Sequence, residues 1–213
     1  MIKQLSRKPV IPSRIKKRLK ILRPLSGGEW DIKTDKAKSI RSEIGEFKSI
    51  LKAQLRDIQN EKCAYCGLTL GETSRYEIEH FAPKGGQVRP QHPEYTFEVI
   101  NLVLACNLCN CSYKKGVYDP IVHGKKALDY RRCDFRIVHP HLDDHSIHYS
   151  WANGNNSILI QGISPKGLES IRLFELDSSV HSEARAKEKA LEYIKNHQDG
   201  NLLLEQILEY SPL

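Results

Sequence analysis

Residues 63–67 read CAYCG and residues 101–110 read NLVLACNLCN, so the chain contains two Cys-x-x-Cys pairs. A Cys-x-x-Cys turn directs two thiolates at one point, and two such turns form a tetrahedral cage that suits Zn²⁺. The sequence therefore predicts a structural zinc site that joins the two ends of this segment. Its ligands would be Cys63, Cys66, Cys106 and Cys109.

Between the two pairs the chain reads YEIEH at residues 76–80, an alternation that predicts a β-strand. Residues 84–96 are polar and rich in Pro and His, so we expect a loop there. A second, more apolar strand or strand-like turn is expected over residues 97–105. Residues 107–115 are predicted to form one short helix that starts inside the second zinc turn. The expected order is strand, loop, strand, helix, with a metal at the start of the helix.

The composition favours an anionic partner. The 213 residues include 33 Lys and Arg against 26 Asp and Glu, which gives a net charge of +7. Nucleic acid is the commonest partner of such a chain, although a basic protein without one stays open. With 39% hydrophobic residues a core is possible but modest, and this favours stabilisation by a metal.

The N-terminus is basic, but no apolar segment of a signal peptide follows it, and no run of about 18 apolar residues occurs. We therefore expect a cytoplasmic protein with no membrane partner, in which thiols stay reduced. A disulfide framework is the poorer interpretation of the six cysteines. Cys111 and Cys133 are left outside the zinc pattern.

The N-terminal 28 residues contain nine Lys and Arg and no acid. Their prolines prevent a long helix, and residues 26–28 read as a hinge. Such an arm is able to lie along a phosphate backbone or to be a solvated, partly mobile tail, and the sequence leaves both open.

Helices are expected on both sides of the zinc segment. Apolar residues recur at spacings of three and four over residues 33–60, the period of an amphipathic helix. Residues 146–151 and 157–160 flank ANGNN, which predicts a β-hairpin. Further helices are expected over residues 165–176, 181–197 and 202–210.

Glu79 and His80 form an acid-histidine pair between the two zinc turns. A neutral histidine is the natural general base near pH 7. Carboxylate and amide oxygens suit Mg²⁺ or Mn²⁺, which keep much of their water and bind substrate phosphate. Glu79 supplies a carboxylate and Asn110 an amide oxygen. An acid-histidine pair alone is a weak signal, but between two zinc turns it indicates a nuclease site.

The segment resembles the HNH endonucleases of the ββα-metal superfamily in their zinc-knuckle form. Their pattern is Cys-x-x-Cys, acid-His, Asn-Leu and a second Cys-x-x-Cys followed by His or Asn, with a Lys after it. The first H falls on His80, the N on Asn101 and the last position on Asn110. Asn at this last position departs from the name and favours Mg²⁺ or Mn²⁺ over a histidine-bound transition metal.

The resemblance implies a role for each matched residue. His80 would be the general base, and Glu79 and Asn110 would hold one catalytic Mg²⁺. Asn101 would tie the loop and orient His80 through a hydrogen bond. Lys84, Lys114 and Lys115 are the candidates for phosphate contacts, although a solvated lysine is the simpler interpretation of each.

A closer resemblance covers more of the chain. The motifs IEHFxPK, NLxLACxxCN, HPHLDD and GLESI occur in the order found in the PtuB-type HNH nucleases of Septu and retron-linked anti-phage defence. Members of that group work beside an ABC-type ATPase, PtuA, which implies such a partner here. The histidines between His139 and His148 fit no zinc spacing, so we interpret them as a turn with Asp caps that packs beside the core.

These patterns predict an α+β fold: a small ββα-metal HNH core with a four-cysteine zinc site, surrounded by α-helices and one extra β-hairpin. Residues 1–28 are the basic N-terminal arm. Residues 29–213 form a single HNH nuclease domain, with the core at 61–118 and the C-terminal hairpin and helices at 119–213.

The predicted function is Mg²⁺-dependent cleavage of DNA in anti-phage defence, with an ATPase partner. Two alternatives stay open: a zinc-stabilised DNA-binding protein without catalysis, and an adaptor that docks to the ATPase.

Overall fold

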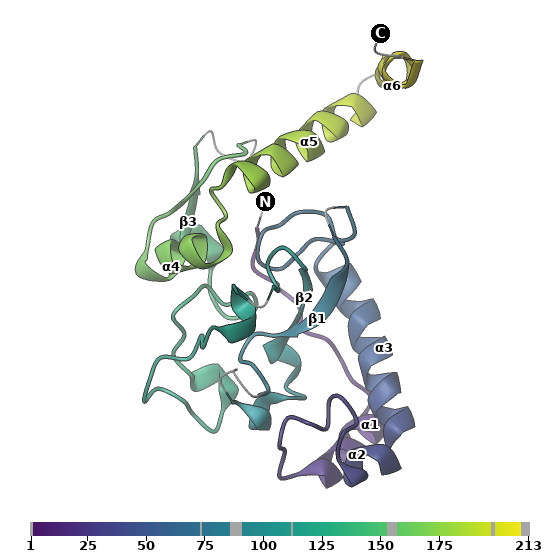
Figure 1. The fold of residues 1–213 in the computed structure, drawn as a ribbon, viewed down its shortest axis with the longest axis vertical. Helices are drawn as coiled ribbons and strands as arrows, with labels where there is room; N and C mark the ends of the chain where they lie inside the picture. The colour runs from purple at the N-terminus through teal and green to yellow at the C-terminus, as the bar shows by residue number, and fades with distance from the viewer. Residues whose placement is uncertain are drawn as a thin grey trace.

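The computed structural model describes residues 2–72, 74–85, 91–111, 113–152, 157–196 and 199–209. Helices and two small antiparallel sheets give the predicted α+β class (Figure 1). The helices are α1 (Ser13–Leu19), α2 (Asp35–Ser39), α3 (Arg41–Ile58), α4 (Pro165–Phe174), α5 (Ser179–Asn196) and α6 (Gly200–Glu209), and the strands are β1 (Tyr76–His80), β2 (Leu102–Cys106), β3 (Tyr149–Trp151) and β4 (Ile160–Gly162). Short 3₁₀ helices lie between them: η1 (Lys20–Leu22), η2 (Pro93–Tyr95), η3 (Val99–Asn101), η4 (Lys115–Val117), η5 (Tyr130–Arg132) and η6 (His145–Ile147).

The predicted amphipathic helix is present but broken. Ile40, with φ −127° and ψ 36°, separates the short α2 from α3. The apolar stripe of α3 is buried, with Phe47 and Leu51 almost fully covered. In Figure 1 the helix runs along one side of the molecule beside β1 and β2, with α1 and α2 at its far end. This helix therefore forms one wall of the core that supports the β1–β2 sheet.

The N-terminal residues pack onto α3 rather than extending into solvent. Ile11, Ile15 and Leu22 are buried in the same hydrophobic core as α3. Exposed ion pairs join the two segments as well: Arg7 with Asp57, Arg14 with Glu46, and Arg18 with Glu43. The interpretation of residues 2–28 as a solvated, partly mobile tail is therefore wrong, because their apolar side chains at helical spacing are buried in the core. Binding of a phosphate backbone by the arm stays a prediction.

β1 and β2 form a two-stranded antiparallel sheet in which Tyr76 pairs with Cys106 and His80 with Leu102. All five residues of β2 are buried. Both strands were predicted, although β2 begins later than residue 97 because η3 occupies Val99–Asn101.

The predicted helix over residues 107–115 is wrong. The described residues there form turns, and the next helical element, η4, begins only at Lys115. The backbone N–H groups of Cys109 and Asn110 both donate to the Cys106 carbonyl, at 3.1 and 2.9 Å. This tight turn brings the sulfurs of Cys106 and Cys109 to one side, so the α-helix of a ββα core is replaced by turns and η4.

The C-terminal part forms the predicted hairpin and three helices. β3 pairs with β4, while residues 153–156 of the ANGNN turn lie outside the described residues. α4 packs closely on this hairpin, because a Cβ on Gly167 would lie 2.0 Å from the His148 carbonyl oxygen. α5 then extends away from the body, with α6 at its far end (Figure 1). Within the described residues, none of the helices combines the length and apolar character needed to cross a bilayer.

Candidate functional site

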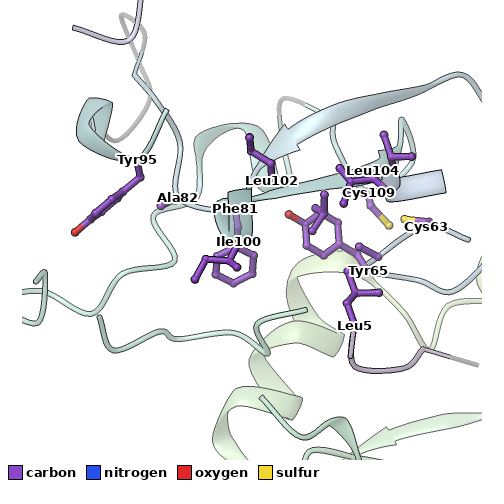
Figure 2. Close-up of a cluster of buried hydrophobic side chains, with 14 of the residues drawn as sticks. Leu5, Cys63, Tyr65, Phe81, Ala82, Tyr95, Ile100, Leu102, Leu104 and Cys109 are labelled. Carbon is purple, nitrogen blue, oxygen red and sulfur yellow. The ribbon is translucent and has the colours of Figure 1, made fainter. Parts of the chain in front are cut away.

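Cys63, Cys66, Cys106 and Cys109 converge as predicted. Their sulfur atoms all lie within 4.8 Å of one another, and all four residues are buried. The Cys66 and Cys106 sulfurs are 3.8 Å apart, the edge of about 3.8 Å expected for a tetrahedron with Zn–S bonds of about 2.3 Å. Figure 2 shows the Cys63 and Cys109 sulfurs pointing toward each other beside Leu104. The four side chains therefore fit Zn²⁺, and we call them the sulfur cage.

Backbone hydrogen bonds shape the sulfur cage from outside. The Cys106 N–H donates to the Cys63 sulfur at 3.4 Å, and the Gly67 N–H donates to the Cys63 carbonyl at 3.0 Å. Burial raises the pKa of the Cys63 thiol, but hydrogen bonds from the three neighbouring thiols outweigh it and hold that pKa well below its usual value. A thiolate is the form that binds metal, so Cys63 favours the ligand state. The pKa values of the Cys66 and Cys109 thiols are instead raised well above their usual value by hydrogen bonds with the other cage thiols, so metal binding there must release protons.

His80 lies at the opposite end of the same hairpin, and its side chain is buried. Its Nε2 is 3.1 Å from the Thr96 carbonyl oxygen. The Trp30 ring meets it edge-on, with centroids 4.5 Å apart. Burial, helped by the positive charges of Lys84 and Lys115, lowers the pKa of His80 to about 3. The imidazole is therefore neutral at physiological pH.

The contact with Thr96 also decides which nitrogen of His80 carries the proton. A carbonyl oxygen only accepts hydrogen bonds, so Nε2 must be the donor. A neutral imidazole has one N–H, and Nδ1 therefore keeps a lone pair. His80 is held in the tautomer that a base acting through Nδ1 requires.

Glu79 precedes His80 in β1, and its side chain is 15% exposed. One carboxylate oxygen is 3.6 Å from the Nζ of Lys115, which is completely buried. The Lys115 ammonium also lies 5.7 Å from the centroid of the Phe81 ring. The structure thus brings Glu79 and Lys115 together, and the lysine partly compensates the charge of the carboxylate.

Asn101 is fully buried, and its side-chain amide has four hydrogen-bonding contacts. Its Oδ1 accepts from the Ala82 N–H and the Tyr130 hydroxyl, both at 2.7 Å. Its Nδ2 donates to the carbonyls of Ala82 and Tyr95 at 3.1 and 3.0 Å. The side chain therefore ties the loop that follows β1. These contacts do not include the direct bond to His80 predicted from the sequence, because the His80 ring bonds to Thr96 instead.

Asn110 lies in the turn after the sulfur cage and is half-buried. The lysines predicted to contact phosphate form ion pairs with different partners. The Lys84 ammonium pairs with Asp31 at 2.7 Å. Lys114 is buried and pairs with Glu175 at 2.9 Å, which ties this turn to the end of α4. The roles of Asn110 in metal binding and of the lysines in phosphate binding stay predictions.

The loop of residues 26–32 is part of the site, although sequence reasoning interpreted residues 26–28 only as a hinge. Trp30 covers His80, and the neighbouring Asp31 pairs with Lys84. A Cβ on Gly27 would lie 2.3 Å from the Lys84 carbonyl oxygen, so only glycine allows this approach. The GGEW sequence was the available signal, because paired glycines before a tryptophan permit a close backbone contact beside a large ring.

The histidines between His139 and His148 are buried and belong to the core. Asp143 accepts a hydrogen bond from the His139 N–H, and Asp144 caps η6. Among the described residues the sulfur cage is the group whose atoms converge for a metal. The interpretation as a capped turn beside the core is confirmed.

Comparison with known proteins relates the chain to Septu proteins. It is 30% identical over 174 residues to the Septu protein PtuB of Bacillus mycoides (strain KBAB4), which covers 75% of this chain and 58% of that protein. It is also 30% identical over 152 residues to the Septu protein PtuB of Bacillus thuringiensis, covering 70% and 50%. The chain thus spans about half the length of these curated relatives. No family model and no solved structure matches it.

Proposed function

We propose that this protein is a metal-dependent HNH endonuclease that hydrolyses phosphodiester bonds of DNA. The observation that carries the proposal is the hydrogen bond from His80 Nε2 to the Thr96 carbonyl, because it leaves Nδ1 as the proton acceptor. The net charge of +7 supports an anionic substrate.

His80 acts as the general base in this proposal. Its low pKa keeps it neutral and able to accept a proton from the attacking water. A substrate phosphate near the ring raises that pKa, because a negative charge stabilises the imidazolium that forms. Proton transfer then becomes more favourable only when substrate is bound.

Glu79 and Asn110 supply the oxygen ligands of the proposed catalytic cation. Carboxylate and amide oxygens are the donors that Mg²⁺ and Mn²⁺ prefer, so the donor set fits such an ion. When bound, the cation would stabilise negative charge on the phosphate and the leaving oxygen. Lys115, 3.6 Å from Glu79, would limit the net negative charge of the site.

The similarity to the Septu protein PtuB supports a role in anti-phage defence. By the same similarity we propose an ABC-type ATPase as partner, which would control the nuclease. The sulfur cage would hold a structural Zn²⁺ without taking part in the chemistry.

A specific observation favours a second candidate function, a zinc-stabilised DNA-binding or adaptor protein without catalysis. The buried Lys115 ammonium lies where it competes with a cation for Glu79. In that case Glu79 and His80 would have structural roles alone.

Plasmid DNA incubated with purified protein and Mg²⁺, with and without the ATPase, separates the two candidates. We expect nicking by the wild type and at least a 100-fold loss in His80→Ala, with the zinc content unchanged. His123→Ala, which removes an exposed histidine elsewhere on the chain, serves as the matched control and should keep full activity. If wild type and His80→Ala are equally inactive under both conditions, the catalytic proposal is wrong.

A further inference from the structure

A directed chain of hydrogen bonds begins at the turn of residues 139–141. The backbone N–H of His141 donates to Nδ1 of His139 at 3.1 Å. Because Nδ1 is the acceptor, the proton of the neutral His139 ring is on Nε2. That Nε2 lies 3.0 Å from the Tyr130 hydroxyl, which in turn donates to Asn101 Oδ1 at 2.7 Å. Each donor in this chain therefore has a definite acceptor.

The chain ends on the backbone that holds His80. Asn101 Oδ1 and Nδ2 fix both polar groups of Ala82, two residues after His80 in sequence. Asn101 Nδ2 also fixes the Tyr95 carbonyl. The next residue, Thr96, provides the carbonyl to which His80 Nε2 bonds. The Asn101 amide thus holds the backbone at Ala82, close after His80, and at Tyr95, next to the residue that His80 bonds.

Burial keeps each group of the chain in one protonation state. Burial raises the pKa of the Tyr130 hydroxyl well above its usual value and lowers the pKa of His139 well below its own. The rings of Phe81 and Phe135 pack against His139, with centroids 4.3 and 4.9 Å away. Water is therefore excluded, and the direction of each hydrogen bond is fixed.

Two donors meet at the same oxygen of Asn101. The Tyr130 hydroxyl and the Ala82 N–H both donate to Oδ1, which excludes the flipped amide. Without the hydroxyl, one of these two constraints is lost and His139 Nε2 loses its acceptor.

We propose that Tyr130 and His139 are positioning residues for His80, acting through Asn101. They hold the Asn101 amide in the one orientation that keeps the Thr96 carbonyl at the Nε2 of His80. The inference rests on the role proposed above for His80 as the base. Neither residue touches the reacting atoms in this arrangement.

Tyr130→Phe tests the proposal with the smallest change, because it removes the hydroxyl and keeps the ring that packs on Tyr95 and Phe135. Tyr118→Phe is the matched control, since its hydroxyl donates to Glu169 outside the chain of bonds. For Tyr130→Phe we expect about a tenfold fall in kcat on plasmid DNA, with KM within about twofold. Tyr118→Phe should leave both values unchanged.

Nitrogen-15 NMR of the His80 ring provides a readout that does not depend on cleavage. The wild type should show the Nε2–H tautomer alone, and Tyr130→Phe a mixture of the two tautomers. An unchanged ring signal in a folded Tyr130→Phe protein would overturn the proposal, whatever happens to kcat. A wild type that cleaves nothing would refute the proposed function instead, and the ring signals would still decide the positioning.

Discussion

The two ends of the β1–β2 hairpin are closed in different ways. Where Tyr76 pairs with Cys106, the sulfur cage joins β2 and the turn after it to the first zinc turn. Where His80 pairs with Leu102, the neutral hydrogen bonds around Asn101 hold the loop. Metal–thiolate bonds contribute far more free energy than neutral hydrogen bonds of about 1 kcal/mol each. With zinc bound as proposed, the cage end would determine whether the core folds, and the other end would determine how His80 is oriented.

Breaking the cage end should have the largest effect. Cys106→Ser removes one thiolate from the buried cage. Structural zinc contributes on the order of 10–16 kcal/mol in zinc-finger peptides, as much as the whole stability of a typical domain. We expect the variant to lose zinc and its cooperative unfolding transition, measured by metal analysis and circular dichroism.

Cys111→Ser is the matched control, because Cys111 lies outside the cage and its sulfur bonds to the Leu108 carbonyl at 3.6 Å. It should retain zinc and unfold cooperatively. A folded, zinc-loaded Cys106→Ser protein would show that the four sulfurs do not form the site.

Breaking the opposite end should cost less. Asn101→Ala leaves buried groups of Ala82, Tyr95 and Tyr130 without their partner. We expect the free energy of unfolding to fall by about 3–5 kcal/mol, with zinc content unchanged, as measured by urea denaturation. Asn107→Ala, on an exposed residue after β2, should change it by less than about 0.5 kcal/mol. Equal costs for the two variants would contradict the importance of the buried amide.

Lowering the pH should reduce the free energy of unfolding, because His141 and His145 are buried in their neutral form. Burial lowers the pKa of both His141 and His145 to about 4, below the value of about 6.5 in an unfolded chain. The unfolded chain therefore binds protons first, and stability that is complete above pH 6.5 is lost as the pH falls toward 4.

The expected slope is up to about 1.4 kcal/mol per pH unit for each histidine. Urea denaturation between pH 7.5 and 5.5 measures this slope. His145→Gln should reduce it by up to about 1.4 kcal/mol per pH unit, the contribution of one histidine. Identical slopes for the two proteins would mean that His145 is not buried in its neutral form.

The sequence predicted the cage end well and the other end poorly, for physical reasons. Metal ligands occur in local pairs, so the spacing of Cys63 and Cys66 is visible in the chain itself. The hydrogen-bond network joins Tyr95, Asn101 and Tyr130, whose separation in sequence carries no such pattern.

The helix predicted over residues 107–115 failed for a related reason. The helix was expected to start inside the second zinc turn. The turn that brings the two cysteines together ends near Asn110, and the N–H groups of Lys114 and Gly116 bond instead to the Cys111 carbonyl in a separate turn. The N-terminal arm was misjudged because its charge was weighed above its apolar residues. Ile11, Ile15 and Leu19 recur every four residues, which is the signal of a buried helical face.

The middle of the hairpin should be the least sensitive position. Glu77 pairs with Ala105 across the strands, and its side chain is 54% exposed. Its ion pair with Arg75 is loose, at 3.4 Å, and exposed, so it contributes little. Thr has a higher strand preference than Glu, so Glu77→Thr should change the free energy of unfolding by less than about 0.5 kcal/mol. A fall of more than about 1.5 kcal/mol in the free energy of unfolding, measured by urea denaturation, would contradict this. It would mean that cross-strand pairs in the middle of the hairpin hold the strands together, rather than the contacts at its two ends.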